Sequence, residues 1–255
     1  MSAAVLLTLI TPPAHALVAD AVAPDRFAAL SAKEIAALPV LHGGRPAELG
    51  DFFQVRGERT AALRIEGDLG RVEGIGTAMA GGELVVAGPV GRDLGLAMAG
   101  GTIDVSGNAG DNAGGARPGA ARGMTGGEIV IRGSAGTLAG AAMRRGLVMV
   151  TGDAGPGVGR GMIAGTVVVG GRTAPGTGRF LKRGSIVALG GAGARPATFR
   201  YACTYRPSYL LVLFRYLRQR YGLAIADRHI TGRYARYAGD MAELGKGEIL
   251  EWVAE

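Results

Sequence analysis

The stretch V-S-G-N-A-G (105–110) decides the fold of this chain, because related copies flank it on both sides. The copies read I-E-G-D-L-G (65–70), V-A-G-P-V-G (86–91), I-R-G-S-A-G (131–136), V-T-G-D-A-G (150–155) and V-G-G-R-T-A (169–174). Their lead glycines from Gly88 to Gly171 are 19, 26, 19 and 19 residues apart, the longer interval being an insertion of seven within 114–122. A fixed repeat of this length indicates a solenoid.

Other columns of the repeat indicate the kind of solenoid. Alternating runs such as Thr102-Ile103-Asp104-Val105 place β-branched residues on one face, as in a half-buried strand. Three short strands and three corners fit into 19 residues, so we predict a mainly β fold, a right-handed parallel β-helix of about six coils. Glycines that need positive φ or close backbone approach form the corner column Gly95, Gly114, Gly140, Gly159 and Gly178. A second column with the same spacing, which we call the Met/Leu column, consists of Met79, Met98, Met124, Met143, Met162 and Leu181.

The composition narrows the class of protein. Among 255 residues the 46 glycines stand in register with a hydrophobic period, so they punctuate a core and do not mark low complexity. The single cysteine, Cys203, excludes a disulfide framework and a cysteine metal cluster, and we expect a buried thiol. The net charge of +7 favours an anionic partner. No stretch approaches the about 20 apolar residues of a membrane span.

The regions outside the repeat predict caps for the two ends of the rod. We divide the chain into an N-terminal capping segment (1–60), the parallel β-helix (61–191) and a C-terminal helical, basic cap (192–255). Ser31 and Glu34 have capping-box spacing and open a short helix, and 51–55 should be a strand that enters the first coil. The second cap should hold a helix over 207–221 that stops at Gly222 and has one apolar face.

The N-terminus allows two interpretations. An apolar run over 3–10 and Ala14-His15-Ala16 resemble a signal peptide and its cleavage site. The run lacks a basic region before it, however, and residues 5–10 are equally typical of a strand. We favour the strand and a cytoplasmic location.

No catalytic constellation is visible in the sequence. His15, His42 and His229 lie outside the repeat and share no metal-ligand spacing with one another or with the cysteine. Hexapeptide acyltransferases need a six-residue period and a histidine on the coil, neither of which is present. Calcium-binding solenoids need an aspartate in every turn, whereas the position after the lead glycine varies from Asp68 to Arg172.

The clearest local signal is a stack of basic residues in the second half of the repeat. Arg160 and Arg179 precede the Met/Leu column by two positions in successive coils, about 4.8 Å apart. They would repel each other unless an anion or a carboxylate lies between them. A solvated face without a partner is one interpretation; a track for a polyanion or a docking face for an acidic subunit is the other. The candidate residues are Arg144, Arg145, Arg160, Arg179, Lys182 and Arg183.

Taken together, these features resemble the C subunit of formylmethanofuran dehydrogenase and, more narrowly, the C subunit of the formyltransferase/hydrolase complex of methylotrophic bacteria. The similarity extends over nearly the whole chain. The glycine repeat alone also resembles the C-terminal domain of the glutamate synthase large subunit, so the flanking segments decide. The segments that carry the resemblance are 27–31, 34–40, 49–53, 67–69, 74–76, 79–82, 107–111, 123–127, 143–146 and 245–249.

The resemblance implies a non-catalytic subunit of a cytoplasmic heterotetramer in one-carbon metabolism, which methylotrophs use in formaldehyde oxidation. Its partners would be the hydrolase, formyltransferase and B-type subunits of an obligate hetero-oligomer, with no nucleic acid and no membrane. Together they would move a formyl group from formyl-tetrahydromethanopterin to a methanofuran-type carrier and hydrolyse it to formate. No cofactor and no metal are expected in this chain, and the basic residues would guide the carrier's polyglutamate tail.

Three alternatives stay open from the sequence. The chain could be the C subunit of a molybdenum or tungsten formylmethanofuran dehydrogenase. It could be a free-standing basic β-helix that binds nucleic acid, although no aromatic residues are interleaved with the basic ones as stacking platforms. It could also be a structural domain like that of glutamate synthase, which would come fused to larger catalytic domains.

Overall fold

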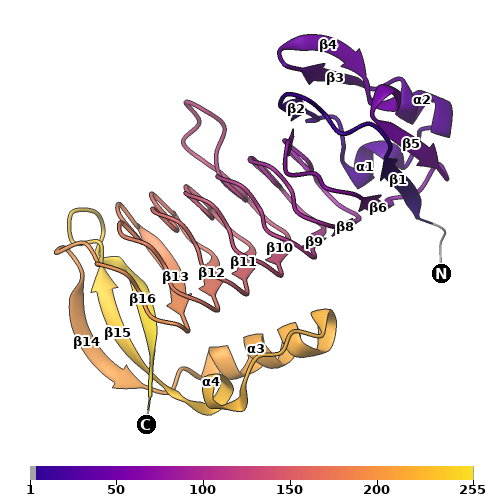
Figure 1. The fold of residues 1–255 in the computed structure, drawn as a ribbon. Helices are drawn as coiled ribbons and strands as arrows, with labels where there is room; N and C mark the ends of the chain where they lie inside the picture. The colour runs from indigo at the N-terminus through magenta and orange to yellow at the C-terminus, as the bar shows by residue number, and fades with distance from the viewer. Residues whose placement is uncertain (1–3, 255) are drawn as a thin grey trace.

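The computed structural model describes residues 4–254, and a single parallel ladder of strands organises them. Each repeat contributes one strand, paired in parallel with the strand one repeat later, and we call such a repeat unit a coil. Figure 1 shows these strands stacked along the molecule, with the chain ends at opposite ends of the stack. They are β6 (Ala62–Glu66), β8 (Glu83–Ala87), β9 (Thr102–Val105), β10 (Glu128–Ile131), β11 (Leu147–Val150), β12 (Thr166–Val169) and β13 (Arg183–Ala188).

The coils contain fewer strands than the sequence predicts. A second side of each coil is held by single parallel bridges, which run from Leu69 through Val90, Ala109, Ala135 and Ala154 to Thr173. The remainder consists of turns whose backbone N–H groups donate to carbonyls of the neighbouring coil. Glycine-rich corners with left-handed residues satisfy the backbone without a regular strand, so the expectation of three strands per coil was wrong.

The core lies inside the coils, where identical positions stack. All residues of the Met/Leu column are fully buried, and alternate strand residues such as Ile103 and Val105 face inward with them. The corner glycines from Gly95 to Gly178 have φ between 61° and 74°, as the repeat predicts. The seven-residue insertion forms a loop over 116–122, which is exposed from residue 117 onward, projects between β9 and β10 (Figure 1) and leaves their register intact.

The N-terminal segment extends the ladder instead of leading into it. Strand β1 (Val5–Leu9) pairs in parallel with β6, and β5 (Phe53–Arg56) pairs antiparallel with β1 at the sheet edge. The strand expected over 51–55 therefore exists but enters no coil. Helices α1 (Pro24–Phe27) and α2 (Ala32–Ala36) lie at this end, and the predicted capping box of Ser31 and Glu34 is present. A small sheet is formed by β4 (Arg45–Glu48), β3 (Pro39–His42), β2 (Leu17–Val18) and β7 (Val72–Glu73); the 3-10 helix η1 spans Leu49–Asp51.

The C-terminal segment extends the other end of the ladder. Strand β16 (Lys246–Val253) pairs in parallel with β13, and β15 (Arg233–Gly239) and β14 (Arg200–Tyr205) follow antiparallel. The outermost strand β14 exposes most of its side chains, among them Cys203. The expectation of a buried thiol was therefore wrong, because Cys203 lies on an edge strand outside both cores.

Helix α3 (Ser208–Tyr221) packs along the outer face of the ladder, as Figure 1 shows. The outward residues Val130, Met149 and Val168 are apolar and buried, and Phe214 and Leu217 cover them in a second core cluster. Each fully buried Phe or Leu side chain contributes about 1.5–3 kcal/mol. Gly222 ends the helix in a left-handed conformation, and α4 (Asp227–Thr231) follows.

The close approach of successive coils predicts unequal costs for two glycine substitutions. A Cβ at Gly101, where φ is +84°, would lie 2.5 Å from Met79 Cε and 2.7 Å from the Gly82 carbonyl oxygen. At Gly161, where φ is +65°, it would meet no atom within 4 Å. Both alanines incur a left-handed penalty of about 1–2 kcal/mol, but Gly101→Ala adds about 1–3 kcal/mol of overpacking. For Gly101→Ala, the midpoint of denaturant unfolding should therefore be well below that of Gly161→Ala. Equal midpoints for the two variants would contradict the close packing at Gly101.

Candidate functional site

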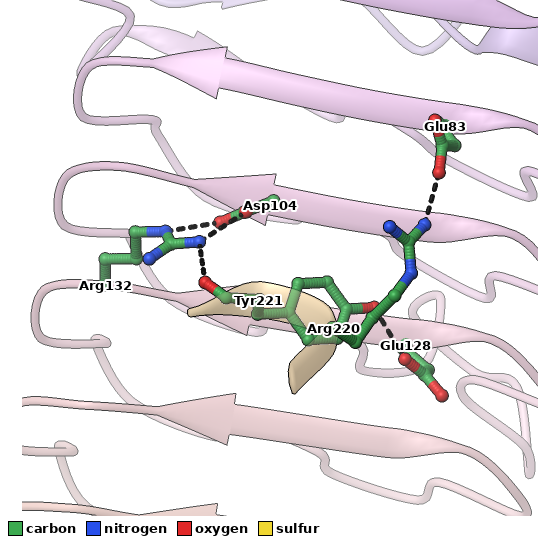
Figure 2. Close-up of polar contacts among 6 residues, drawn as sticks. All are labelled: Glu83, Asp104, Glu128, Arg132, Arg220 and Tyr221. Carbon is green, nitrogen blue, oxygen red and sulfur yellow. Dashed lines mark hydrogen bonds and ion pairs between the residues drawn. The ribbon is translucent and has the colours of Figure 1, made fainter. Parts of the chain in front are cut away.

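One flank of the ladder is fixed by polar contacts between α3 and the strands (Figure 2). Arg132 Nε and Nη2 donate to the two Asp104 carboxylate oxygens at 2.8 Å, and Nη2 also donates to the Tyr221 carbonyl at 2.7 Å. The Tyr221 hydroxyl donates to Glu128 Oε2 at 2.5 Å, and Arg220 forms an ion pair with Glu83. These contacts hold the last turn of α3 over strands β8, β9 and β10.

The same contacts shift the ionisation of their members. Burial, reinforced by the hydrogen bond to Glu128, raises the pKa of the Tyr221 hydroxyl, so this group stays a donor at physiological pH. The hydrogen bond to Asp104 raises the pKa of Arg132. This flank is therefore a structural clamp, since its charges are used within the chain.

Basic residues of the C-terminal cap are likewise paired. Arg218 bonds Asp227 at 2.7 Å and Arg236 bonds Glu248 at 2.7 Å. Much of the positive charge that the sequence places at this end is therefore neutralised locally. Other exposed arginines of the cap, such as Arg215 and Arg233, form no ion pair among the described residues. A further cluster of unpaired positive charge lies outside the cap.

It lies at the corner just before Met162 and Leu181, which mark the fifth and sixth coils when coils are counted along the Met/Leu column. Arg160 and Arg179 are exposed, and neither forms a salt bridge within residues 4–254. Their guanidinium carbons lie 5.8 and 5.0 Å from the ring centroid of Phe180, a cation–π range. The sequence predicts that an anion or a carboxylate must relieve their repulsion. The structure places the Phe180 ring beside both arginines, and the Asp240 carboxylate is close enough to Arg179 for the two charges to interact.

The other four candidate residues are less closely associated with this corner. Lys182 is 4.0 Å from Glu243, and Arg183 is exposed at the start of β13. Arg144 and Arg145 occupy the equivalent positions two coils earlier, where the intervening coil has Ile163 and Ala164. The structure thus brings Arg160, Arg179 and the neighbouring Lys182 together but interrupts the predicted ridge.

Sequence reasoning missed the two residues that shape this corner, Phe180 and Asp240. In earlier coils the N–H group just before the Met/Leu column donates to a carbonyl of the next coil, as Gly161 does to Arg179 at 2.8 Å. The sixth coil has no successor in the repeat, and the Phe180 N–H donates to Asp240 Oδ2 at 2.9 Å. In the sequence, the one feature that could have indicated this contact is that Asp240 is an acidic residue in the C-terminal segment, where glycines are fewer.

The Asp240 carboxyl is buried, but its surroundings favour the charged form. Burial alone would raise its pKa; the adjacent Thr198 hydroxyl, hydrogen bonds from the Ala242 and Phe180 backbones and the Arg179 charge lower the pKa below its usual 3.8. A hollow of about 420 Å³ opens beside it, lined by Arg179, Phe180, Arg195, Pro196, Thr198 and Asp240.

A second cleft, of about 450 Å³, lies between the ladder and the α3–α4 loop. Arg132 and His229 line it with Met149 and Leu223, and burial followed by the charge of Arg228 lowers the pKa of His229. Within residues 4–254 no group of three or more His, Cys, Asp or Glu side chains is placed to hold a metal ion. Among the described helices, none has the length and apolar character that a membrane crossing requires.

Comparison with known proteins defines the class. No family model matches the chain. It is 37% identical over 91 residues to the C subunit of the tungsten-containing formylmethanofuran dehydrogenase 2 of Methanothermobacter wolfeii, and 38% identical over 80 residues to the C subunit of the molybdenum-containing enzyme 1 of Methanosarcina barkeri. These matches cover 34% and 29% of this chain, and only 34% and 27% of the relatives' own lengths.

A solved structure extends the likeness to almost the whole chain. It is a chain of the formyltransferase/hydrolase complex from Methylorubrum extorquens, determined with methylofuran, and superimposes with a TM-score of 0.80 at 32% identity. The match covers 98% of this chain and all of that chain. The fold and the comparisons therefore define the class of the protein, which is a mainly β repeat protein similar to a chain of that complex. The chain belongs to the family of formylmethanofuran dehydrogenase C subunits.

The buried carboxylate predicts a pH-dependent loss of stability in Asp240→Asn. A carboxyl with a lowered folded pKa stabilises the fold above its unfolded pKa, and this contribution disappears as the pH falls through the folded value. The free energy of unfolding of the variant should therefore lie below that of the wild type at about pH 7, with a difference that shrinks towards about pH 2. Urea unfolding at several pH values measures this. A difference that is constant with pH would show that the charge does not hold the corner.

Proposed function

We propose that this chain is a non-catalytic structural subunit of a formyltransferase/hydrolase complex. The observation that carries the proposal is the end-to-end match to a chain of the Methylorubrum extorquens complex, which includes both ends as well as the coils. In this role the chain supports transfer of a formyl group from formyl-tetrahydromethanopterin to a methanofuran-type carrier and its hydrolysis to formate by partner subunits. The assembly is a cytoplasmic, obligate heterotetramer with hydrolase, formyltransferase and B-type subunits, used in formaldehyde oxidation.

The architecture that we infer for this role is a right-handed parallel β-helix. Parallel pairing with a one-coil offset and the line of single bridges support a helical path of the chain. Crossovers between parallel strands are right-handed in nearly all proteins, because strand twist favours that hand. Residues 61–191 form the helix, and 1–60 and 192–255 close its ends with strands and short helices.

The exposed basic residues are the candidate contact with the carrier or a partner. Arg160 and Arg179 are free of salt bridges in the described chain. Lys182 and Arg183 lie next to them in the sequence, and Arg144 and Arg145 occupy the equivalent positions two coils earlier. A polyglutamate tail carries the complementary charge. We therefore propose that these residues guide the carrier tail or hold an acidic partner.

The partial sequence matches support one further candidate, the C subunit of a molybdenum or tungsten formylmethanofuran dehydrogenase. A free-standing chain that binds nucleic acid is a more distant possibility and would show binding that weakens steeply with salt. Membrane and nucleic-acid partners form no part of our proposal.

Purification from the native cell tests the function. A tagged chain should elute with further subunits, and the eluate should transfer formyl groups to the carrier and release formate without molybdenum or tungsten. Formylmethanofuran oxidation with bound metal would instead assign the dehydrogenase. A chain that elutes alone would reject both assignments.

Charge reversal tests the role of the basic residues. Arg160→Glu with Arg179→Glu should weaken carrier binding or complex assembly by at least about tenfold, because attraction becomes repulsion. The matched control is Arg172→Glu with Arg215→Glu, which makes the same charge change at exposed arginines elsewhere. Unchanged carrier affinity together with unchanged assembly would contradict both versions of this proposal.

A further inference from the structure

The position of Phe180 can be compared with the equivalent position in each of the other coils. The residue just before the Met/Leu column is Ala78, Ala97, Gly123, Ala142 and Gly161 in the first five coils and Phe180 in the sixth. Four of those five small residues have φ between 54° and 65°, and Phe180 has φ +63°. The backbone at this corner is thus left-handed in most coils, and only the last coil places a large side chain on it.

The turn itself does not require a large side chain. The left-handed backbone costs about 1–2 kcal/mol for Ala and for Phe alike, and Ala serves the same corner in three other coils. The Phe180 ring remains 36% exposed, so it does not complete a core. An exposed aromatic ring at a corner that alanine serves in other coils points to a contact outside the chain.

The surroundings of the ring define the chemistry of that contact. Arg160 and Arg179 flank it at cation–π distance without salt-bridge partners in the described chain. The hollow of about 420 Å³ lies directly beside the ring, and its other charged groups already have partners in the chain. Arg195 is paired with Glu251, and the Asp240 carboxylate, which also faces the charge of Arg179, accepts hydrogen bonds from the Phe180 and Ala242 N–H groups. An apolar anchor, two available guanidinium groups and a concave neighbour together form the composition of an interaction hot spot.

We infer that Phe180, Arg160 and Arg179 form the docking site for an acidic segment of a partner protein, which places an apolar side chain against the ring and carboxylates against the arginines. Charge complementarity favours an acidic segment. The exposed ring and the hollow favour a protein over a free polyglutamate tail, because such a tail has only carboxylates and amides to offer an aromatic surface. The inference rests on the proposed membership of a multi-subunit complex and names the face that one partner covers.

Photo-crosslinking in the purified native complex tests the site. With Phe180→p-benzoylphenylalanine in the tagged chain, irradiation should join position 180 to a co-purifying subunit at a segment that contains several Asp or Glu residues. The control, Val212→p-benzoylphenylalanine on the exposed face of α3, should not reach that segment. No crosslink in an intact complex, a crosslink to a protein segment without acidic residues, or one to a glutamate-tailed small molecule would overturn the inference.

Phe180→Ala gives a second, independent measurement. Alanine is the residue of three other coils at this corner, so thermal unfolding of the purified chain should not become easier. Dissociation of the complex should accelerate about 10- to 100-fold, as for loss of an aromatic hot spot, while Val212→Ala leaves it unchanged. An unaltered dissociation rate would overturn the inference. A complex that assembles and crosslinks but lacks formyl transfer would reject the proposed function alone.

Discussion

The structure depends on the requirement that each coil satisfy the backbone of the next. Strands about 4.8 Å apart leave no freedom in the register of successive coils, since an N–H that misses its carbonyl on the following coil would be buried without a partner. Side chains are excluded where the coils touch: a Cβ at Gly126 would lie 2.3 Å from the Ala99 carbonyl oxygen. The insertion obeys the same constraint. It projects into solvent, and Ile103 still pairs with Ile129.

A repeating ladder has two open ends, and both are satisfied by segments that do not belong to the repeat. Strand β1 continues the ladder before the first coil, and β16 continues it after the last. At the corner where no further coil exists, the Asp240 carboxylate accepts the hydrogen bond that a backbone carbonyl accepts elsewhere. The terminal segments thus complete the backbone of the rod as well as cover its ends, which protects it from edge-to-edge association.

Ion pairing, more than the number of charged residues, determines where the surface is positive. The net charge is +7, yet four arginines on or near α3 meet carboxylates from the strands, from α4 or from β16; these are Arg132, Arg218, Arg220 and Arg236. Positive charge stays available at the Phe180 corner because Arg160 and Arg179 form no salt bridge within residues 4–254. The nearby Asp240 carboxylate accepts hydrogen bonds from backbone N–H groups, and Glu243 lies beside Lys182.

The sequence by itself determined the repeat, its register, the inward face of each strand and the helix near 208–221, because periods of this kind reflect purely local geometry. Apolar outward residues such as Val130 and Val168 also indicate a covering element, but the sequence does not show that the predicted helix lies over them. Only the tertiary structure decided which charges are free. The partners of Arg132, Arg220 and Phe180 lie 28, 137 and 60 residues away in the chain. Contacts over such separations depend on how the cap folds back onto the coils, and no periodicity in the sequence encodes them.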